Sequence, residues 1–308
     1  WYALSTVWLA RFPIDVAARI WFGLNLAMFI LAAWLLTRDQ PGLKSWIEAA
    51  AGLLWLPMLG GLLVGQFSMP LLLGAALMVH ALRRETPVLV ALAATLLSFK
   101  PHIGGPLLVL IVAYLALRGD AFARRGLLAV LITALVLFAA GFLASPQWPT
   151  AYLQSLGGFR SVSGVAACEQ CVSLSTSLAR LFGGGLNQAL WISGVIALLL
   201  AAWLTIRWRA VSATAGSLMA AGILATLLAS PYLLNYDYLL LLMPFIELAR
   251  HKLPVTGRVA LGIAYVLPFI SLGIWGTAGN VSMIISACIL LGIALALYRQ
   301  ANPAGEAA

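Results

Sequence analysis

A small set of polar side chains could do chemistry in this otherwise apolar sequence. They lie where long apolar runs end, in four separate stretches of the chain: Gln66; Lys100 and His102; Arg160 and Glu169; and Asn235, Tyr236 and Asp237. Ionisable groups at the edge of a membrane are costly, so they indicate a functional site. Cationic donors bind phosphate, and a carboxylate can orient a partner or transfer a proton. Together these residues predict a cleft at one face of a membrane.

The segment Lys100-Pro101-His102 carries the sharpest signal. Pro101 disfavours helical geometry at the residue before it, so it predicts that a helix ends at Lys100. A new helix then begins near Gly104, and its N-terminus together with Lys100 would stabilise a bound phosphate. The alternative is that Lys100 reaches towards lipid head groups and that His102 is only interfacial.

The segment from Ser230 to Tyr238 is the second candidate. Asp237 lies at the outer edge of an apolar run whose next nine residues carry no charge. Its carboxylate could transfer a proton, or could pair with a cation and orient a partner. The alternative is a structural hydrogen bond to a helix end, made with the help of Asn235 or Ser230.

Two further motifs allow a functional and a structural interpretation. In the stretch from Gly61 to Gln66, small residues permit close helix packing, and Gln66 could bind a sugar hydroxyl. A turn with a packing glycine explains the same residues equally well. Cys168 and Cys171 are spaced for a local disulfide in an oxidising compartment, whereas the context of a redox or zinc motif is missing.

The elements that position these residues are membrane helices. The chain has 308 residues, of which 63% are hydrophobic and 9% are charged, and its mean hydropathy of +1.02 excludes a soluble domain. Apolar runs long enough for spanning helices predict an all-α, polytopic bundle of about eleven spans. The runs are 20–37, 46–63, 67–82, 87–99, 103–117, 126–144, 187–206, 212–229, 233–249, 259–275 and 281–298.

The basic residues predict the orientation of the bundle. If residue 20 starts outside, thirteen Lys and Arg residues lie inside and five outside, which follows the positive-inside rule. We therefore expect a multi-pass protein of a bacterial-type inner membrane. The stretch 145–186 is then an extracytoplasmic loop, and the tail 299–308 is cytoplasmic. Glu48 and Glu247 fall near inner span ends, within reach of loop cations. Residues 1–308 are predicted to form one bundle, and because residues 1–18 start outside, we expect a crossing to precede them.

Several short stretches, in this order, resemble glycosyltransferase family 87 over roughly residues 1–250. They are Gly65-Gln66-Phe67, Arg83-Arg84, Ser98-Phe99-Lys100-Pro101-His102-Ile103-Gly104, Ser175-Thr176-Ser177-Leu178-Ala179-Arg180-Leu181, Ala229-Ser230-Pro231-Tyr232 and Tyr236-Asp237. The resemblance implies an enzyme of GT-C architecture that moves a mannose-like hexose from a polyprenyl phosphate to a glycan or glycolipid acceptor. Transfer would take place on the extracytoplasmic face, with inversion and without a cofactor.

The resemblance also bears on the site residues. Lys100, His102 and Arg160 would bind the donor phosphate, Gln66, Asn235 and Tyr236 the substrate, and Asp237 would orient it or transfer a proton. The family's main base is a carboxylate in a loop that would precede Trp1, so we expect it outside this sequence. Family members usually have Asn where this chain has Phe67, which weakens the role of Gln66. The chain has no Asp-x-Asp pair, so no ligands for a metal-bridged nucleotide sugar are visible.

A transporter or a flippase of lipid-linked substrates is the main alternative, since it shares the apolar spans and the polar groups at the membrane edge. Such proteins tend to have internal repeats and charged or broken helices at the midplane. The two halves of this chain show no convincing repeat, and its polar groups gather towards one face. A membrane scaffold without activity would not need Lys100, His102 and Asp237 on one side.

Overall fold

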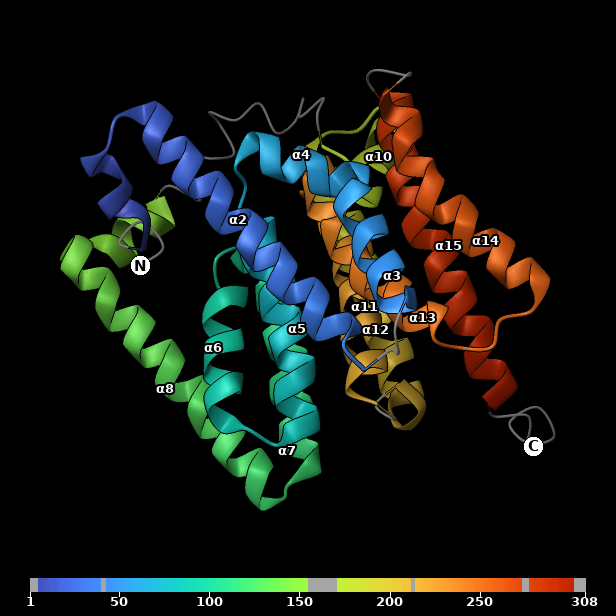
Figure 1. Ribbon diagram of the computed structural model, residues 1–308, viewed down its shortest axis with the longest axis horizontal. Coiled ribbons are helices and arrows are strands. Elements are labelled where there is room, and N and C mark those ends of the chain that lie inside the picture. The colour runs from blue at the N-terminus through green and yellow to red at the C-terminus, as the bar shows by residue number, and fades with distance from the viewer. Residues whose placement is uncertain (1–4, 40–42, 155–170, 212–213, 273–276, 302–308) are drawn as a thin grey trace. The chain divides into compact units, whose positions relative to one another are not determined.

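The computed structural model describes residues 5–39, 43–154, 171–211, 214–272 and 277–301, and every element within them is a helix (Figure 1). The all-α prediction is therefore confirmed for the described residues. The chain divides into two compact units. The first comprises Trp1–Leu35 and Gly61–Cys168, and the second Leu36–Gly60 and Glu169–Ala308. We describe each unit by itself.

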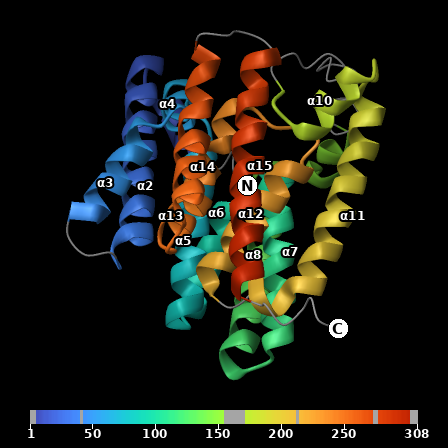
Figure 2. The ribbon, with the colours of Figure 1, turned by 90° about the vertical axis from the view of Figure 1, so that its right-hand side faces the viewer.

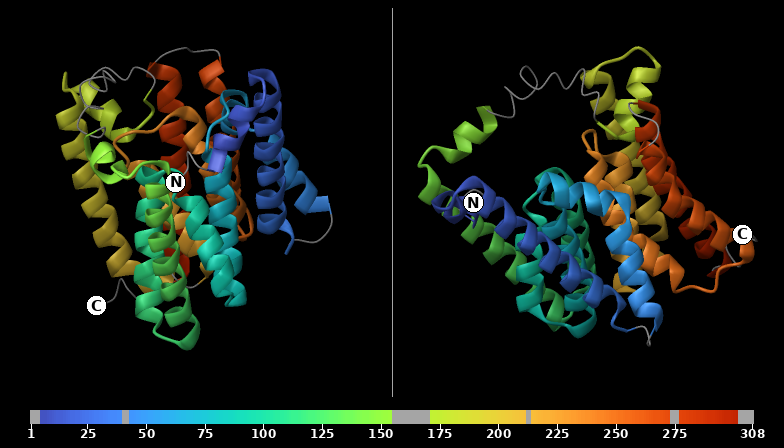
Figure 3. Two further views of the ribbon diagram at one scale, coloured as in Figure 1. Left: turned by 90° about the vertical axis from the view of Figure 1, so that its left-hand side faces the viewer. Right: turned by 45° about the horizontal axis from the view of Figure 1, so that its top comes forward.

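The first unit is built around α5, whose residues from Ser68 to Val79 are all buried. Helix α6 packs against α5, and α8 packs against α6 and runs beside α7 (Figure 3). Gly74 permits this close packing, because a Cβ there would lie 3.1 Å from the carbonyl oxygen of Ala93 in α6. The elements are η1 (Val7–Arg11), α2 (Ile14–Thr37, which extends past the unit boundary), α5 (Ser68–Arg84), α6 (Pro87–Leu97), α7 (Pro101–Arg118) and α8 (Ala121–Ala144).

Two contacts at opposite ends of α5 show that the helices of this unit alternate in direction. At the start of α5, the Lys100 Nζ donates to the Ser68 Oγ at 3.2 Å. At its other end, Arg118 forms an ion pair with Glu85. Helix α5 is about 25 Å long, so the two contacts are separated by most of the thickness of a bilayer's hydrocarbon core. The order of α5, α6 and α7 thus follows the alternation that the basic residues predict.

The turn between α7 and α8 is polar and well capped. The Asp120 Oδ1 accepts a hydrogen bond from the Ala123 backbone N–H at 2.7 Å, which closes the N-terminus of α8. This hydrogen bond, followed by the one from Arg118, holds the pKa of the Asp120 carboxyl below its usual value. The same end of the unit therefore carries Glu85, Arg118 and Asp120 as one charged group.

In the second unit, α12 packs against α11, α13 and α15. Helices α14 and α15 run side by side (Figure 2). Helix α10 packs against α11 and α12. The elements are α3 (Leu43–Leu54), α4 (Leu56–Val64, which ends in the first unit), α10 (Leu174–Leu181), α11 (Leu186–Val211), α12 (Ala215–Ala229), η3 (Asn235–Leu241), α13 (Leu242–Ala249), α14 (Val255–Val266), η4 (Leu267–Leu272) and α15 (Thr277–Ala301).

Every apolar run of the sequence contains a helix, but the predicted count of about eleven spans is not reached by helix length. Four described helices are long and apolar enough to cross a membrane, and the bent pair α3 and α4 raises the number to five. Further apolar helices have 10–17 described residues. Prolines interrupt two of the apolar runs. Pro57 breaks the helix after Leu54 and bends the pair by 58°, and Pro268 lies where α14 changes to the 3₁₀ turn η4.

The surface of the longest helices is apolar. Helix α8 exposes large hydrophobic side chains along its whole length, among them Leu128, Ile132, Val136 and Leu143. Helix α11 does the same from Trp191 to Ile206. Water would not tolerate apolar surface on this scale, whereas lipid does. The chain is therefore a multi-pass membrane protein.

Gly104 and Gly105 are adjacent in α7 but differ in their surroundings. A Cβ at Gly104 would lie 1.8 Å from the Leu97 carbonyl oxygen, at the end of α6, whereas a Cβ at Gly105 meets nothing within 4 Å. We expect Gly104→Ala to destabilise the protein by about 1–3 kcal/mol, because backbone atoms must move. Gly105→Ala should be neutral or stabilising, by up to about 1 kcal/mol from helix propensity. Thermal unfolding in detergent measures both, and equal melting temperatures for the two variants would contradict the close approach.

Candidate functional site

Lys100 lies at a break between two helices, as the sequence predicts, but α6 already ends at Leu97 and α7 begins at Pro101 rather than near Gly104. Its backbone is extended, with φ −124° and ψ 90°, and Pro101 is the first residue of α7. The side chain is half-buried and donates to the Ser68 hydroxyl. Lys100 therefore holds a positive charge at a helix N-terminus, and a helix N-terminus also favours anions.

Three aromatic rings form a stack beside this lysine. The ring of Phe67 lies 5.1 Å from that of Trp21 and 5.2 Å from that of Phe99, measured between ring centroids. All three are half-buried. Phe67 directly precedes Ser68 and Phe99 directly precedes Lys100, so the aromatic stack (Trp21, Phe67, Phe99) borders the Lys100–Ser68 hydrogen bond. In the sequence, Phe67 is only a departure from the family pattern. In the structure, its ring contacts both of the other rings of the stack.

Gly65 forms the turn that brings Phe67 to this position. Its φ of +69° is left-handed, and the Gln66 N–H donates to the Gly61 carbonyl at 3.1 Å, which closes the end of α4 in a Schellman motif. The Trp21 Nε1 donates to the Gly65 carbonyl at 2.7 Å. Gly65 therefore has the structural role considered for this stretch, a glycine in a turn. The Gln66 side chain is half-buried, and its contact with a sugar stays a prediction.

His102, Arg160 and Glu169 differ in whether the structure describes them. His102 lies in the first turn of α7, two residues beyond Lys100, and is exposed. Arg160 lies outside the described residues, as does Glu169.

A group of hydroxyls in the second unit connects two stretches that the sequence analysis names separately. The Ser173 Oγ and Thr176 Oγ1 donate to the Pro231 carbonyl at 3.1 and 2.9 Å. The Val172 N–H donates to the Leu233 carbonyl at 2.8 Å, and the Val172 carbonyl accepts from the Tyr238 hydroxyl at 2.6 Å. The start of α10 is therefore fastened to the loop between α12 and η3, and the two family-like motifs form one structure.

Asp237 lies in η3 at the centre of that loop structure and is 1% exposed. Its Oδ2 accepts a hydrogen bond from the Leu234 N–H at 3.1 Å, which caps the 3₁₀ helix. Tyr236 is buried and Asn235 is exposed, and the Asn235 Oδ1 accepts from the Tyr236 N–H at 2.8 Å. The structural role considered for Asp237 is therefore present. A catalytic role stays a prediction.

Arg180, which the site prediction omits, is a further cationic candidate. It lies in the last turn of α10, and its Nη2 is buried without a hydrogen-bond partner among the described residues. Its signal in the sequence is that it is one of the five basic residues on the side that the positive-inside rule disfavours. Nearby, Cys171 is disulfide-bonded, and Cys168 lies outside the described residues.

The predicted cleft combines residues of both units. Lys100, His102 and Gln66 belong to the first, whereas Asn235, Tyr236 and Asp237 belong to the second. Their meeting in one cleft stays a prediction. Within the described part of the chain, no three His, Cys, Asp or Glu side chains lie close enough to hold a metal ion.

The comparison with known families decides the class of the protein. Residues 1–231 match glycosyltransferase family 87. The chain belongs to this family. It is a membrane glycosyltransferase and so acts on a sugar donor and an acceptor, which sets aside the transporter and the scaffold. No curated protein and no solved structure matches the chain. The match includes the aromatic stack, Lys100 and α10, and it ends just before Asp237.

Tyr238 tests whether α10 depends on the loop before η3. We expect Tyr238→Phe to lower the free energy of unfolding by about 1 kcal/mol, because the buried Val172 carbonyl loses its hydrogen bond. Thermal unfolding in detergent measures this loss. Tyr152→Phe, at an exposed tyrosine, serves as the control and should leave the melting temperature unchanged. An unchanged melting temperature for Tyr238→Phe would show that the fastening is not needed.

Proposed function

We propose that this enzyme transfers a mannose-like hexose from a polyprenyl phosphate to a hydroxyl of a glycan or glycolipid, on the extracytoplasmic face of the membrane. The observation that carries the proposal is the position of Lys100: a half-buried ammonium, hydrogen-bonded to Ser68 at the N-terminus of α7. Family membership supplies the reaction class, and this cation supplies a place for a phosphate.

The reaction needs positive charge beside the departing phosphate more than it needs a group that protonates it. The acceptor hydroxyl loses its proton to a carboxylate base, and its oxygen attacks C1 of the sugar while the bond between C1 and the phosphate oxygen breaks. The electron pair of that bond leaves with the polyprenyl phosphate, which departs as an anion. Positive charge and oriented N–H donors at the phosphate stabilise this leaving group. Lys100, His102 and Arg160 are proposed to provide them.

The aromatic stack suits the rest of the donor. Phe99 directly precedes Lys100, and its half-buried ring lies against that of Phe67, which in turn contacts Trp21. Such rings pack well against a sugar ring or the first isoprene units of a lipid. We propose that they line the path of the donor. Gln66, Asn235 and Tyr236 are proposed to bind the sugar or the acceptor.

Asp237 is proposed to orient the acceptor or the sugar, or to accept the proton. Its carboxylate is held in one position by burial and by the hydrogen bond from the Leu234 N–H. A carboxylate fixed in this way loses little entropy on binding a substrate hydroxyl. Because this hydrogen bond also caps η3, a test of the functional role needs a variant in which the cap is kept.

Lys100→Ala removes the proposed phosphate cation. We expect the rate of hexose transfer to fall about a hundredfold or more, as when one stabilising donor of a leaving or attacking oxygen is lost. Membrane insertion should stay unchanged, and the free energy of unfolding should fall by only about 1 kcal/mol, for the lost hydrogen bond to Ser68. Labelled polyprenyl-phosphate hexoses, incubated with the intact protein and candidate acceptors, measure the transfer. Arg124→Ala, at an exposed cation near the charged end of the first unit, is the control and should keep full activity. Transfer by Lys100→Ala at the wild-type rate would overturn the phosphate role.

Asp237→Asn separates the two roles of this residue. An Asn oxygen can still accept from the Leu234 N–H, so the fold should persist, but the charge and the proton acceptor are lost. We expect transfer to fall about tenfold or more. The same labelled-donor assay, read together with the melting temperature, checks this. A variant of normal stability and normal rate would assign Asp237 to capping alone.

A further inference from the structure

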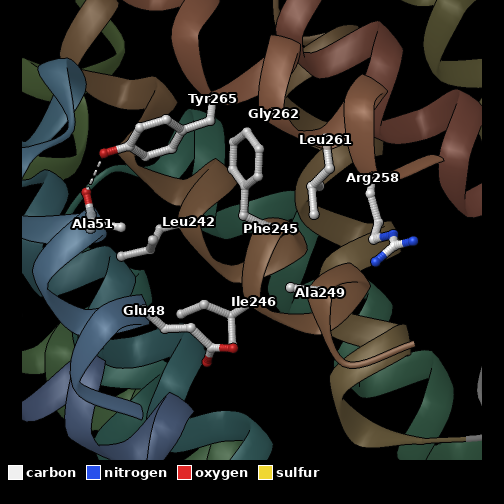
Figure 4. Close-up of a pocket in the computed structure, with 11 residues that line it drawn as sticks. Glu48, Ala51, Leu242, Phe245, Ile246, Ala249, Arg258, Leu261, Gly262 and Tyr265 are labelled. Carbon is white, nitrogen blue, oxygen red and sulfur yellow. Dashed lines mark hydrogen bonds between the residues drawn. The ribbon is translucent and has the colours of Figure 1, made fainter. Parts of the chain in front are cut away.

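The second unit contains a cavity that the proposed reaction does not use. Its volume is about 350 Å³, and its walls come from α3, α13 and α14 (Figure 4). This volume lies within the range of ligand pockets in proteins. We call it the α3–α13–α14 pocket. The lining residues are mostly apolar, and the only charged ones among them are Glu48 and Arg258.

The apolar wall of the pocket is held in place by hydrogen bonds of its aromatic residues. The Tyr265 hydroxyl donates to the Ala51 carbonyl at 2.8 Å, and the Tyr265 carbonyl accepts from the Trp55 Nε1 at 3.0 Å. The ring of Phe245 lies 5.2 Å from that of Trp55, at nearly a right angle. These contacts keep the ring faces in position, so the cavity is formed before a ligand enters.

Glu48 brings a buried carboxylate into this pocket. Its side chain is 12% exposed, and both of its oxygens are buried without a hydrogen-bond partner among the described residues. Its Oε1 forms an ion pair with the Nζ of Lys44 at 3.7 Å, and Lys44 itself is half-exposed. Glu247 likewise pairs with Arg250, but it also accepts a hydrogen bond from Ser217. A buried carboxylate without hydrogen bonds is costly, and a ligand with N–H donors would remove that cost.

Arg258 brings the opposite charge to a different wall, in the first turns of α14. Its guanidinium is exposed and has no ion pair with another described residue. Figure 4 shows it apart from Glu48, with the apolar side chains of Ile246 and Ala249 between them and those of Phe245 and Leu261 to one side. The pocket thus presents an acceptor of N–H groups, an anion-binding guanidinium and an apolar surface.

We propose that the α3–α13–α14 pocket binds a phospholipid with a primary ammonium head group, of the phosphatidylethanolamine kind. The ammonium donates to Glu48, the phosphate pairs with Arg258, and the start of an acyl chain lies along the apolar wall. A choline head group has no N–H to donate, and a glycerol head group has no positive charge, so neither satisfies Glu48 equally well.

The place of the pocket in the unit agrees with a lipid head group. Ala249 of its lining is the last residue of α13 and lies between Glu247 and Arg250 in the sequence, whereas Asp237 belongs to the other end of the η3–α13 segment. The positive-inside pattern predicts this end on the cytoplasmic side, where head groups of the inner leaflet are found. The inference does not rest on the proposed sugar transfer.

Lipid binding to the purified protein tests the inference. Native mass spectrometry after titration with phosphatidylethanolamine, phosphatidylcholine or phosphatidylglycerol of the same acyl chains measures the affinity for each. We expect about tenfold tighter binding of phosphatidylethanolamine than of the other two, the size of one charge-assisted hydrogen bond. Glu48→Gln should abolish this preference, and Arg258→Gln should weaken the binding of all three.

Control variants keep the result independent of folding. Glu85→Gln and Arg124→Gln change exposed charges of the first unit and should leave the preference unchanged. Gly262 lines the pocket and has open space where a Cβ would stand, so Gly262→Leu should fill the cavity and displace the lipid without altering a charge. Equal binding of the three lipids by the wild type would overturn the inference. An unchanged preference in Glu48→Gln or in Gly262→Leu would do the same.

Discussion

Unpaired backbone groups in an apolar environment are the constraint on which this structure depends. Helices satisfy these groups internally, but each break in a helix frees carbonyls that lipid cannot bind. Side chains from elsewhere in the chain close these breaks: Trp21 at the Gly65 carbonyl, Trp55 at Tyr265, Thr176 at Pro231 and Tyr238 at Val172. The polar residues of the chain are therefore concentrated where helices end, and a substrate can meet them there.

The candidate site lies at two of these helix breaks. Helix α6 ends at Leu97 and α7 begins at Pro101, which leaves Lys100 in the break, and the Schellman turn at Gly65 carries Phe67 and Ser68 to that lysine. One short region thus combines a cation, a helix N-terminus and ring faces. This combination is the basis for the proposed donor, a lipid-linked sugar phosphate, whereas membership of glycosyltransferase family 87 supplies only the reaction class.

In the second unit, hydroxyl groups and charged side chains lie at opposite ends of α12 and α13. The end with Ser175, Ser230 and Asp237 is rich in hydroxyls and backbone contacts, whereas the other end holds Glu247 and Arg250. The pocket around Glu48 lies towards the charged end. A substrate site and a lipid site could therefore exist in one unit without competing for the same residues.

Local signals determined what the sequence alone could establish: the all-helical membrane class, the break at Lys100 and the family, since apolar length, proline and short motifs act over a few residues. The number of full-length spans was not predictable, because bends such as the one at Pro57 depend on what the bent helix packs against. The aromatic stack, the attachment of α10 to the loop after α12, and the absence of a hydrogen bond to the Glu48 carboxylate from any described residue came only from the tertiary structure. The stack and this attachment join segments tens of residues apart, and the spacing of residues along a chain carries no information about which distant backbone groups a side chain must satisfy.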